Sequence, residues 1–282
     1  MNSAGWRTNI AVLATLTLMT LAGCSLSPSS SSGQGEPKLG AIEKIVSPSQ
    51  VNRPIRSFLP SVQQVAALGQ LQLQAANTCL KKNQSEGSFE VSGASFEQFA
   101  QQSQSEDVMY SPLWGFFGTE SVSNYGYNRP SGGGFQSISP TVGVSDSVST
   151  KCLNESMNAL GGVSWSSFIY PSALPNGGPP APLTDSRWLA VVTKWSSCMK
   201  EQGFNYAGPL DALYDGNFRP SVSVTPAQIA TATADIQCKI STNMVGIGAA
   251  LQAAYDQRYI DSHRSELAAF QDKIDSLLRG HG

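Results

Sequence analysis

Cysteine is the residue type in this chain whose number and spacing point most directly to chemistry. One cysteine, Cys24, closes an apolar N-terminal run, and the other four are Cys79, Cys152, Cys198 and Cys238. None of the four forms a C-x-x-C pair, so their spacing does not favour a zinc site or a thioredoxin-type redox centre. An even set of four in an oxidising compartment predicts two disulfides, drawn from three pairings.

The order of features along the chain favours one pairing. In each of two segments, a helix ends shortly after a cysteine, an Arg-Pro loop follows, and a second predicted helix carries another cysteine. The segments are Cys79…Arg129…Cys152 and Cys198…Arg219…Cys238. This order favours Cys79–Cys152 and Cys198–Cys238, and it suggests two related halves. The alternative is a chance similarity between short Gly/Pro loops, which leaves the crossed pairings open.

Residues for nucleophilic catalysis are sparse. His263 and His281 are the only histidines, and His281 lies in a Gly-flanked tail. A Ser-His or Cys-His mechanism needs an imidazole held within hydrogen-bond reach of the nucleophile. We expect His263 to be a solvated helix residue. The chain contains no G-x-S-x-G, H-E-x-x-H or P-loop motif, so we assign no catalytic residue.

Acidic residues offer two weaker kinds of site. Asp211, Asp215 and Asn217 surround Gly216 and hint at calcium, but the spacing is not that of an EF-hand, and Asx-rich turns are common without metal. We therefore expect neither a metal nor a cofactor. Paired carboxylates acting on glycan or peptide are the enzymatic alternative, and nothing in the sequence singles out two of the twenty acidic residues.

Aromatic residues are the best candidates for binding. Their rings offer large apolar faces that stack on sugars or dock a partner. The candidates are Trp114, Phe116, Phe117, Tyr125 and Tyr127. The alternative is that these loops have no other core, so that the rings bury one another.

The elements that must position these residues are mainly α-helical. Apolar residues recur at three- and four-residue steps in about four principal helices, joined by long Gly/Ser/aromatic loops and stapled by the two disulfides. The helices are expected to start near Ser61, Asp146, Asp185 and Thr225, and the first and third to end near Lys82 and Gly203. A shorter helix capped by Ser95 is fainter, within a long irregular stretch from residue 83 to 145.

The last helix is expected to be very long. If it were continuous from Pro226, it would run ~50 residues, or ~75 Å. Its two apolar stripes are out of phase between Asp256 and His263, which predicts a bend there. Part of this helix is expected to project or to pair with another helix, and it is the favoured contact surface.

The N-terminus has the layout of an export signal. Arg7 precedes an apolar segment that ends in Leu-Ala-Gly-Cys24, which resembles the bacterial lipobox. In that motif the cysteine is acylated and residues 1–23 are removed. We then expect a flexible tether over residues 24–58 and a disulfide-stapled helical domain over residues 59–282, with halves at 59–162 and 184–282.

Composition limits the partners. The net charge is −2 at pH 7, and charged residues make up 13% of the chain, so there is no basic patch for nucleic acid. The expected partners are the membrane, through lipid on Cys24, and an envelope protein or wall component. The protein is expected on the outer face of the cytoplasmic membrane.

A family resemblance covers about residues 184–278 and the lipobox. The motifs are Trp195-Ser-Ser-Cys198-Met-Lys-Glu-Gln-Gly-Phe and Ala-Asp235-Ile-Gln-Cys238-Lys239. They resemble the C-terminal part of a group of largely uncharacterised exported actinobacterial lipoproteins. The first half departs from the pattern, because Cys79 is followed by Leu-Lys-Lys-Asn without the expected Gly-aromatic pair. The resemblance implies compartment and shape, and it assigns no catalytic residue.

Overall fold

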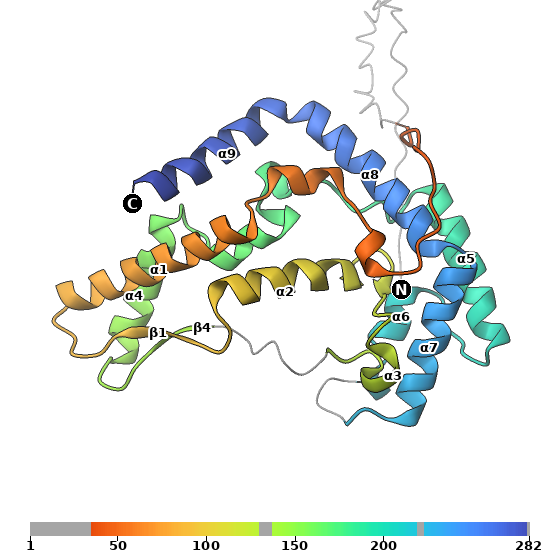
Figure 1. The fold of residues 1–282 in the computed structure, drawn as a ribbon, viewed down its shortest axis with the longest axis horizontal. Coiled ribbons are helices and arrows are strands. Elements are labelled where there is room, and N and C mark those ends of the chain that lie inside the picture. The colour runs from red at the N-terminus through yellow and green to blue at the C-terminus, as the bar shows by residue number, and fades with distance from the viewer. Residues whose placement is uncertain (1–34, 130–136, 219–222, 281–282) are drawn as a thin grey trace, which may run out of the picture. The chain divides into compact units, whose positions relative to one another are not determined.

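The computed structural model of the chain describes residues 35–129, 137–218 and 223–280, and within these ranges the fold is mainly helical (Figure 1). The helices are α1 (Val62–Lys82), α2 (Phe96–Met109), α3 (Val122–Tyr125), α4 (Asp146–Ala159), α5 (Ser186–Glu201), α6 (Pro209–Leu213), α7 (Pro226–Ser241), α8 (Met244–Ser262) and α9 (Arg264–Arg279). The strands are β1 (Phe89–Ser92), β2 (Tyr110–Ser111), β3 (Gly115–Phe116) and β4 (Ser137–Pro140).

Side-chain caps explain where the predicted helices begin. The Ser61 hydroxyl accepts a hydrogen bond from the backbone N–H of Gln64, and the Gln64 side chain accepts one from the backbone N–H of Ser61. Ser95 forms the same capping box, so the faint helix is confirmed and runs for 14 residues as α2. Such caps satisfy backbone N–H groups that have no partner inside the helix.

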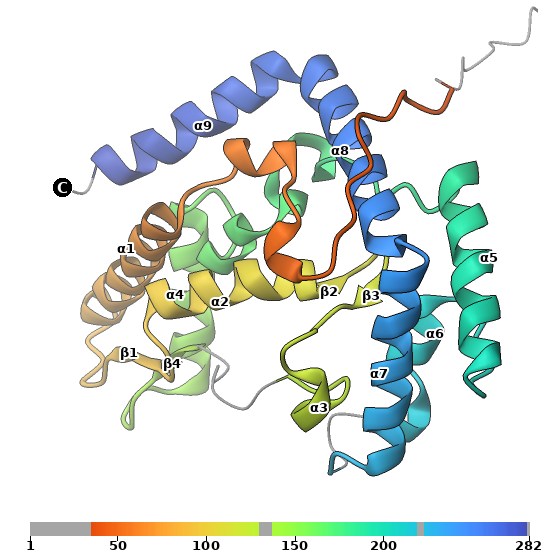
Figure 2. The same cartoon turned by 45° about the vertical axis from the view of Figure 1, so that its right-hand side comes forward.

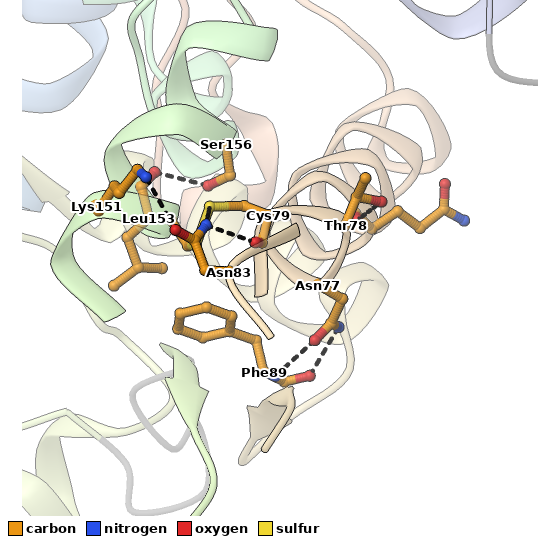
Figure 3. Close-up of a disulfide and its surroundings, with 10 residues drawn as sticks. Asn77, Thr78, Cys79, Asn83, Phe89, Lys151, Leu153 and Ser156 are labelled. Atoms are coloured by element: carbon orange, nitrogen blue, oxygen red, sulfur yellow. Dashed lines mark hydrogen bonds between the residues drawn. A yellow bond between two sulfur atoms is a disulfide. The ribbon is translucent and has the colours of Figure 1, made fainter. Parts of the chain in front are cut away.

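The described part of the stretch between α1 and α4 is more ordered than its composition predicts. Besides α2, it contains an antiparallel pair in which Phe89 of β1 lies opposite Pro140 of β4. Figure 3 shows how β1 is attached to α1: the Asn77 amide donates to the Phe89 carbonyl at 3.0 Å and accepts from the Phe89 N–H at 2.7 Å. The Asn77 side chain thus fixes the position of β1 along the axis of α1.

The expected long C-terminal helical region is present and runs as three consecutive helices, α7, α8 and α9. Asn243 adopts a left-handed conformation, φ 53°, between α7 and α8. The predicted bend is confirmed at His263, which separates α8 from α9. Leu267 and Ile274 of α9 are buried, and Ile274 packs with the core residues of α1. The apolar stripe of α9 is therefore paired with the rest of the fold.

The two predicted disulfides are confirmed. Cys79–Cys152 joins α1 to α4, and Cys198–Cys238 joins α5 to α7. Such bonds indicate an extracellular or otherwise oxidising environment. Across the described ranges, no helix combines the length and the apolar character needed to cross a bilayer.

The segment ahead of α1 differs from the expected tether. Residues 36–60, here called the strap, pass along α8 and the end of α2, coloured red to orange in Figures 1 and 2. Ile45 and Ile55 of the strap are 5% and 0% exposed, so the compact body begins at Glu36 rather than at residue 59. Burial of two isoleucines outweighs the polar composition that suggested a loose segment. The expected signal (1–23) and Cys24 lie outside the described residues.

Candidate binding site

Most of the aromatic binding candidates lie in the core. Trp114, Phe116, Phe117 and Tyr127 are at most 4% exposed, and Tyr125 is half-buried. Phe116 and Tyr127 meet edge to face, with ring centroids 5.5 Å apart. These four rings therefore form the core described by the alternative reading, and they offer no surface to a ligand.

A buried polar network lies among these rings. Lys239 and Asp235 are fully buried, and Lys239 Nζ lies 2.7 Å from Asp235 Oδ2. The ammonium also donates to the Phe116 carbonyl at 2.6 Å. Asp235 accepts further hydrogen bonds from Trp195 Nε1 at 2.9 Å and from the Tyr127 hydroxyl at 3.4 Å. Trp195 of α5 and Asp235 of α7 thus meet in space and satisfy each other's polar groups.

Burial shifts both charged groups of this network. Desolvation raises the pKa of the Asp235 carboxyl, opposed by the attraction of Lys239. Desolvation lowers the pKa of the Lys239 ammonium, opposed by Asp235. Every group already has its partners inside the protein, so the arrangement stabilises the fold instead of presenting a reactive group. The four-residue spacing on one helix was a signal for this pair that sequence reasoning did not use.

The other polar candidates also have structural partners. Asp215 accepts from the Tyr206 hydroxyl at 2.7 Å and from the Asn217 backbone at 2.9 Å, and the backbone hydrogen bond is the main cause of its lowered pKa. The Asp211 carboxylate accepts from Gly208 N. His263 stacks on the Tyr259 ring, with centroids 4.3 Å apart. In the described part of the chain, no three His, Cys, Asp or Glu residues gather as metal ligands would.

A cavity lies between the strap and α2, and we call it the strap cleft. Its volume is about 590 Å³, within the usual range of ligand sites. The strap contributes Ser47, Pro48, Ser49, Val51 and Arg56. The start of α1, α2 and the segment after β3 contribute Val62, Gln101, Gln104, Ser105, Val108, Met109, Thr119 and Glu120. The lining therefore combines aliphatic side chains with amides and hydroxyls and carries two charges.

Arg56 is the one cation of the lining. Its Nη2 donates to Asp107 Oδ2 at 3.0 Å and to the Gln104 carbonyl at 3.3 Å. The Arg56 side chain is 25% exposed, and burial lowers the pKa of its guanidinium. Asp107 and Gln104 thus hold Arg56 in place from α2.

The wall formed by the strap is fixed by two further groups of contacts. Arg53 pairs with the fully buried Asp256 of α8 through Nε at 3.1 Å and Nη2 at 2.7 Å. Nearer its start, Asn243 donates to the Glu43 carbonyl and accepts from Ile45 N. These bonds span about 200 positions of sequence, so the cleft exists only in the folded chain.

The start of the strap is fastened separately. The Glu36 carboxylate accepts from Ser186 N at 2.6 Å and from the Ser186 hydroxyl at 2.9 Å, at the first residue of α5. Arg187 donates to the Pro37 carbonyl at 2.9 Å. A carboxylate at a helix N-terminus complements the helix dipole. The strap is therefore anchored from Glu36, its first residue, onward.

A smaller hollow of about 350 Å³ lies between the end of the strap and α9. Asp272 and Asp275 line it together with Gln64, whose amide donates to Asp275 at 3.2 Å. Both acidic residues are exposed. The enzymatic alternative requires two carboxylates close together, and Asp272 and Asp275 in this hollow are such a pair. Comparison with protein-family models, with curated proteins and with solved structures finds no match to this chain.

Proposed function

We propose that this protein is an exported, lipid-anchored envelope protein that binds a partner or wall component in the strap cleft without catalysing a reaction. The lipobox-like sequence ending at Cys24 and the two disulfides support the compartment. The resemblance to exported actinobacterial lipoproteins supports the same assignment.

The observation that carries the binding role is the chemistry of the strap cleft. Its lining holds amides, hydroxyls, aliphatic groups, one guanidinium and one carboxylate. General acid–base catalysis by two carboxylates needs a second acid, and nucleophilic catalysis needs a base beside the nucleophile. A lining of this kind favours recognition of a polar ligand over its conversion.

The anchor is tested on the natural protein. Membrane fractionation and intact mass without reduction should find the chain in the membrane fraction, beginning at an acylated Cys24 and retaining two disulfides. The Cys24→Ser variant should lose the acyl mass and leave the membrane fraction. Recovery of unlipidated wild-type protein from the cytosol with four free thiols would contradict the proposal.

The binding role is tested by blocking the cleft. Ser105 lines the cleft from an exposed position on α2, so Ser105→Trp should fill it without disturbing the core. Gln70→Trp, exposed on α1 away from the cleft, is the matched control. A purified wall digest and purified envelope proteins are titrated against each by calorimetry. Wild type and Gln70→Trp should bind a component that Ser105→Trp does not. Equal binding by all three would exclude the cleft.

A further inference from the structure

The chemistry of the strap cleft limits what it can take. Sugars are commonly stacked on aromatic rings, and no aromatic side chain lines this cleft. A phosphate carries up to two negative charges and is usually held by several cations. Arg56 is the single cation of this lining, and the negative charge of Glu120 would repel a phosphate. A fatty chain would leave the amides of Gln101 and Gln104 and the hydroxyl of Thr119 without partners.

A peptide satisfies each part of this lining. Its backbone N–H and C=O groups match side-chain amides and hydroxyls, which both donate and accept. Its small aliphatic side chains match Val51, Val62 and Val108. The charged groups of the lining, Arg56 and Glu120, can distinguish the two ends of a peptide.

Arg56 has donors that suit the carboxyl end of a peptide. Both bonds that hold it to α2 come from Nη2, and among the described residues Nε and Nη1 make no hydrogen bond. The guanidinium is therefore held in place by one nitrogen and keeps donors on the other two. A hydrogen bond from an ionised donor to a carboxylate is stronger than one between neutral groups, and more so in a partly dehydrated cleft.

We propose that the strap cleft binds a short peptide through its free carboxyl terminus, with Arg56 donating to the terminal carboxylate. This inference rests on the proposed function and names its ligand class. Glu120 is then an opposing charge that weakens the binding of the carboxylate, and its removal strengthens that binding.

The probes are acetyl-Ala-Ala-Ala with a free carboxyl terminus and the same peptide as its amide. Calorimetric titration of the full chain should give a dissociation constant at least about tenfold lower for the acid than for the amide. Arg56→Gln should abolish this preference. Lys44→Gln is the matched control: it also removes one cation from the strap, at an exposed position outside the cleft lining, and should keep the preference.

A second variant separates loss of the fold from loss of recognition. Glu120 is exposed, so Glu120→Gln should leave the fold intact. It should lower the dissociation constant of the acid peptide about two- to fivefold and leave that of the amide peptide unchanged. Equal binding of acid and amide by wild type, no binding of either, or unchanged preference in Arg56→Gln would each overturn the inference. In those cases a wall component that binds wild type but not Ser105→Trp still supports the proposed function, so the two failures are distinguishable.

Discussion

Asp235 and Lys239 lie one turn apart on α7 and form an ion pair whose side chains have no exposure to solvent. Two charges removed from water are tolerated there because each is also hydrogen-bonded to another group. Trp195 donates to the carboxylate, and the Phe116 carbonyl accepts from the ammonium. The pair links α7 to α5 and to β3 beside the Cys198–Cys238 bond. Its loss should therefore destabilise the packing of all three elements.

Removing one member of this pair should therefore be costly. Lys239→Met leaves the Asp235 carboxylate buried without its cation and should lower the free energy of unfolding by about 3–5 kcal/mol, measured by urea denaturation. The double variant with Asp235→Leu should be more stable than Lys239→Met alone, because no charge is left unpaired. Lys200→Met, exposed on α5, is the control and should change stability by less than about 0.5 kcal/mol. Additive costs in the double variant would contradict this account.

Gly246 should report on docking of the strap. A Cβ at this helical position would collide with the Glu43 carbonyl oxygen and with Asn243 Oδ1. A helical Gly→Ala change usually stabilises by about 0.5–1 kcal/mol, so a net loss would isolate the collision. We expect Gly246→Ala to destabilise by about 1–3 kcal/mol and to speed hydrogen exchange in residues 36–50. Gly40→Ala, with open space around it, should leave exchange unchanged.

The two disulfides should differ in reactivity. Cys79 and Cys152 are 1% and 0% exposed, whereas Cys198 is partly exposed. Exchange requires a thiolate to reach a sulfur atom, so mild dithiothreitol should open Cys198–Cys238 first. Alkylation and peptide mapping of partly reduced protein would show this order. Opening of Cys79–Cys152 first would contradict it.

Either bond should also matter for stability. The loops closed by the disulfides span 73 and 40 residues of sequence separation. On the chain-entropy model, each bond contributes roughly 4 kcal/mol, a large share of the ~5–15 kcal/mol typical of a folded domain. Replacement of both cysteines of either bond by serine should lower the urea midpoint accordingly.

Stability should fall in acid partly through Asp185. Hydrogen bonds from Arg187 lower the pKa of the buried Asp185 carboxyl below its ordinary value. A carboxyl with a depressed folded-state pKa stabilises the fold above its unfolded pKa of about 3.9 and loses that contribution as pH falls through the folded value. Urea unfolding from pH 6 to pH 2 should show a shallower decline in Asp185→Asn than in wild type.

The role of Arg187 provides the internal check on this pH dependence. Asp185→Asn should cost about 1–3 kcal/mol at pH 7, because a charge-assisted hydrogen bond is lost. In the background of Arg187→Gln, the Asp185→Asn change should alter the pH slope much less. An equal effect in both backgrounds would show that other partners, such as the backbone N–H of residue 187 and the Tyr255 hydroxyl, lower the pKa of Asp185.

Local patterns in the sequence were sufficient for the starts of α1, α2, α4, α5 and α7 and for the break at His263, but not for α3, α6 or the break at Asn243. The caps at Ser61 and Ser95, the αL glycine Gly203 after α5 and the phase change near His263 each act within a few residues. The order of features around the four cysteines was enough to favour the observed disulfides. The motif at Cys24 likewise predicts export from a few neighbouring residues.

Only the tertiary structure decided which surfaces are available. Phe116 and Phe117 looked like candidate binding residues, yet they are core, because burial depends on what packs against a side chain from elsewhere in the chain. The strap looked like a tether, but Arg53 meets Asp256 some 203 positions away and fixes it to α8. The strap cleft depends on those long-range contacts, and the pairing of distant residues leaves no periodic signal in the sequence.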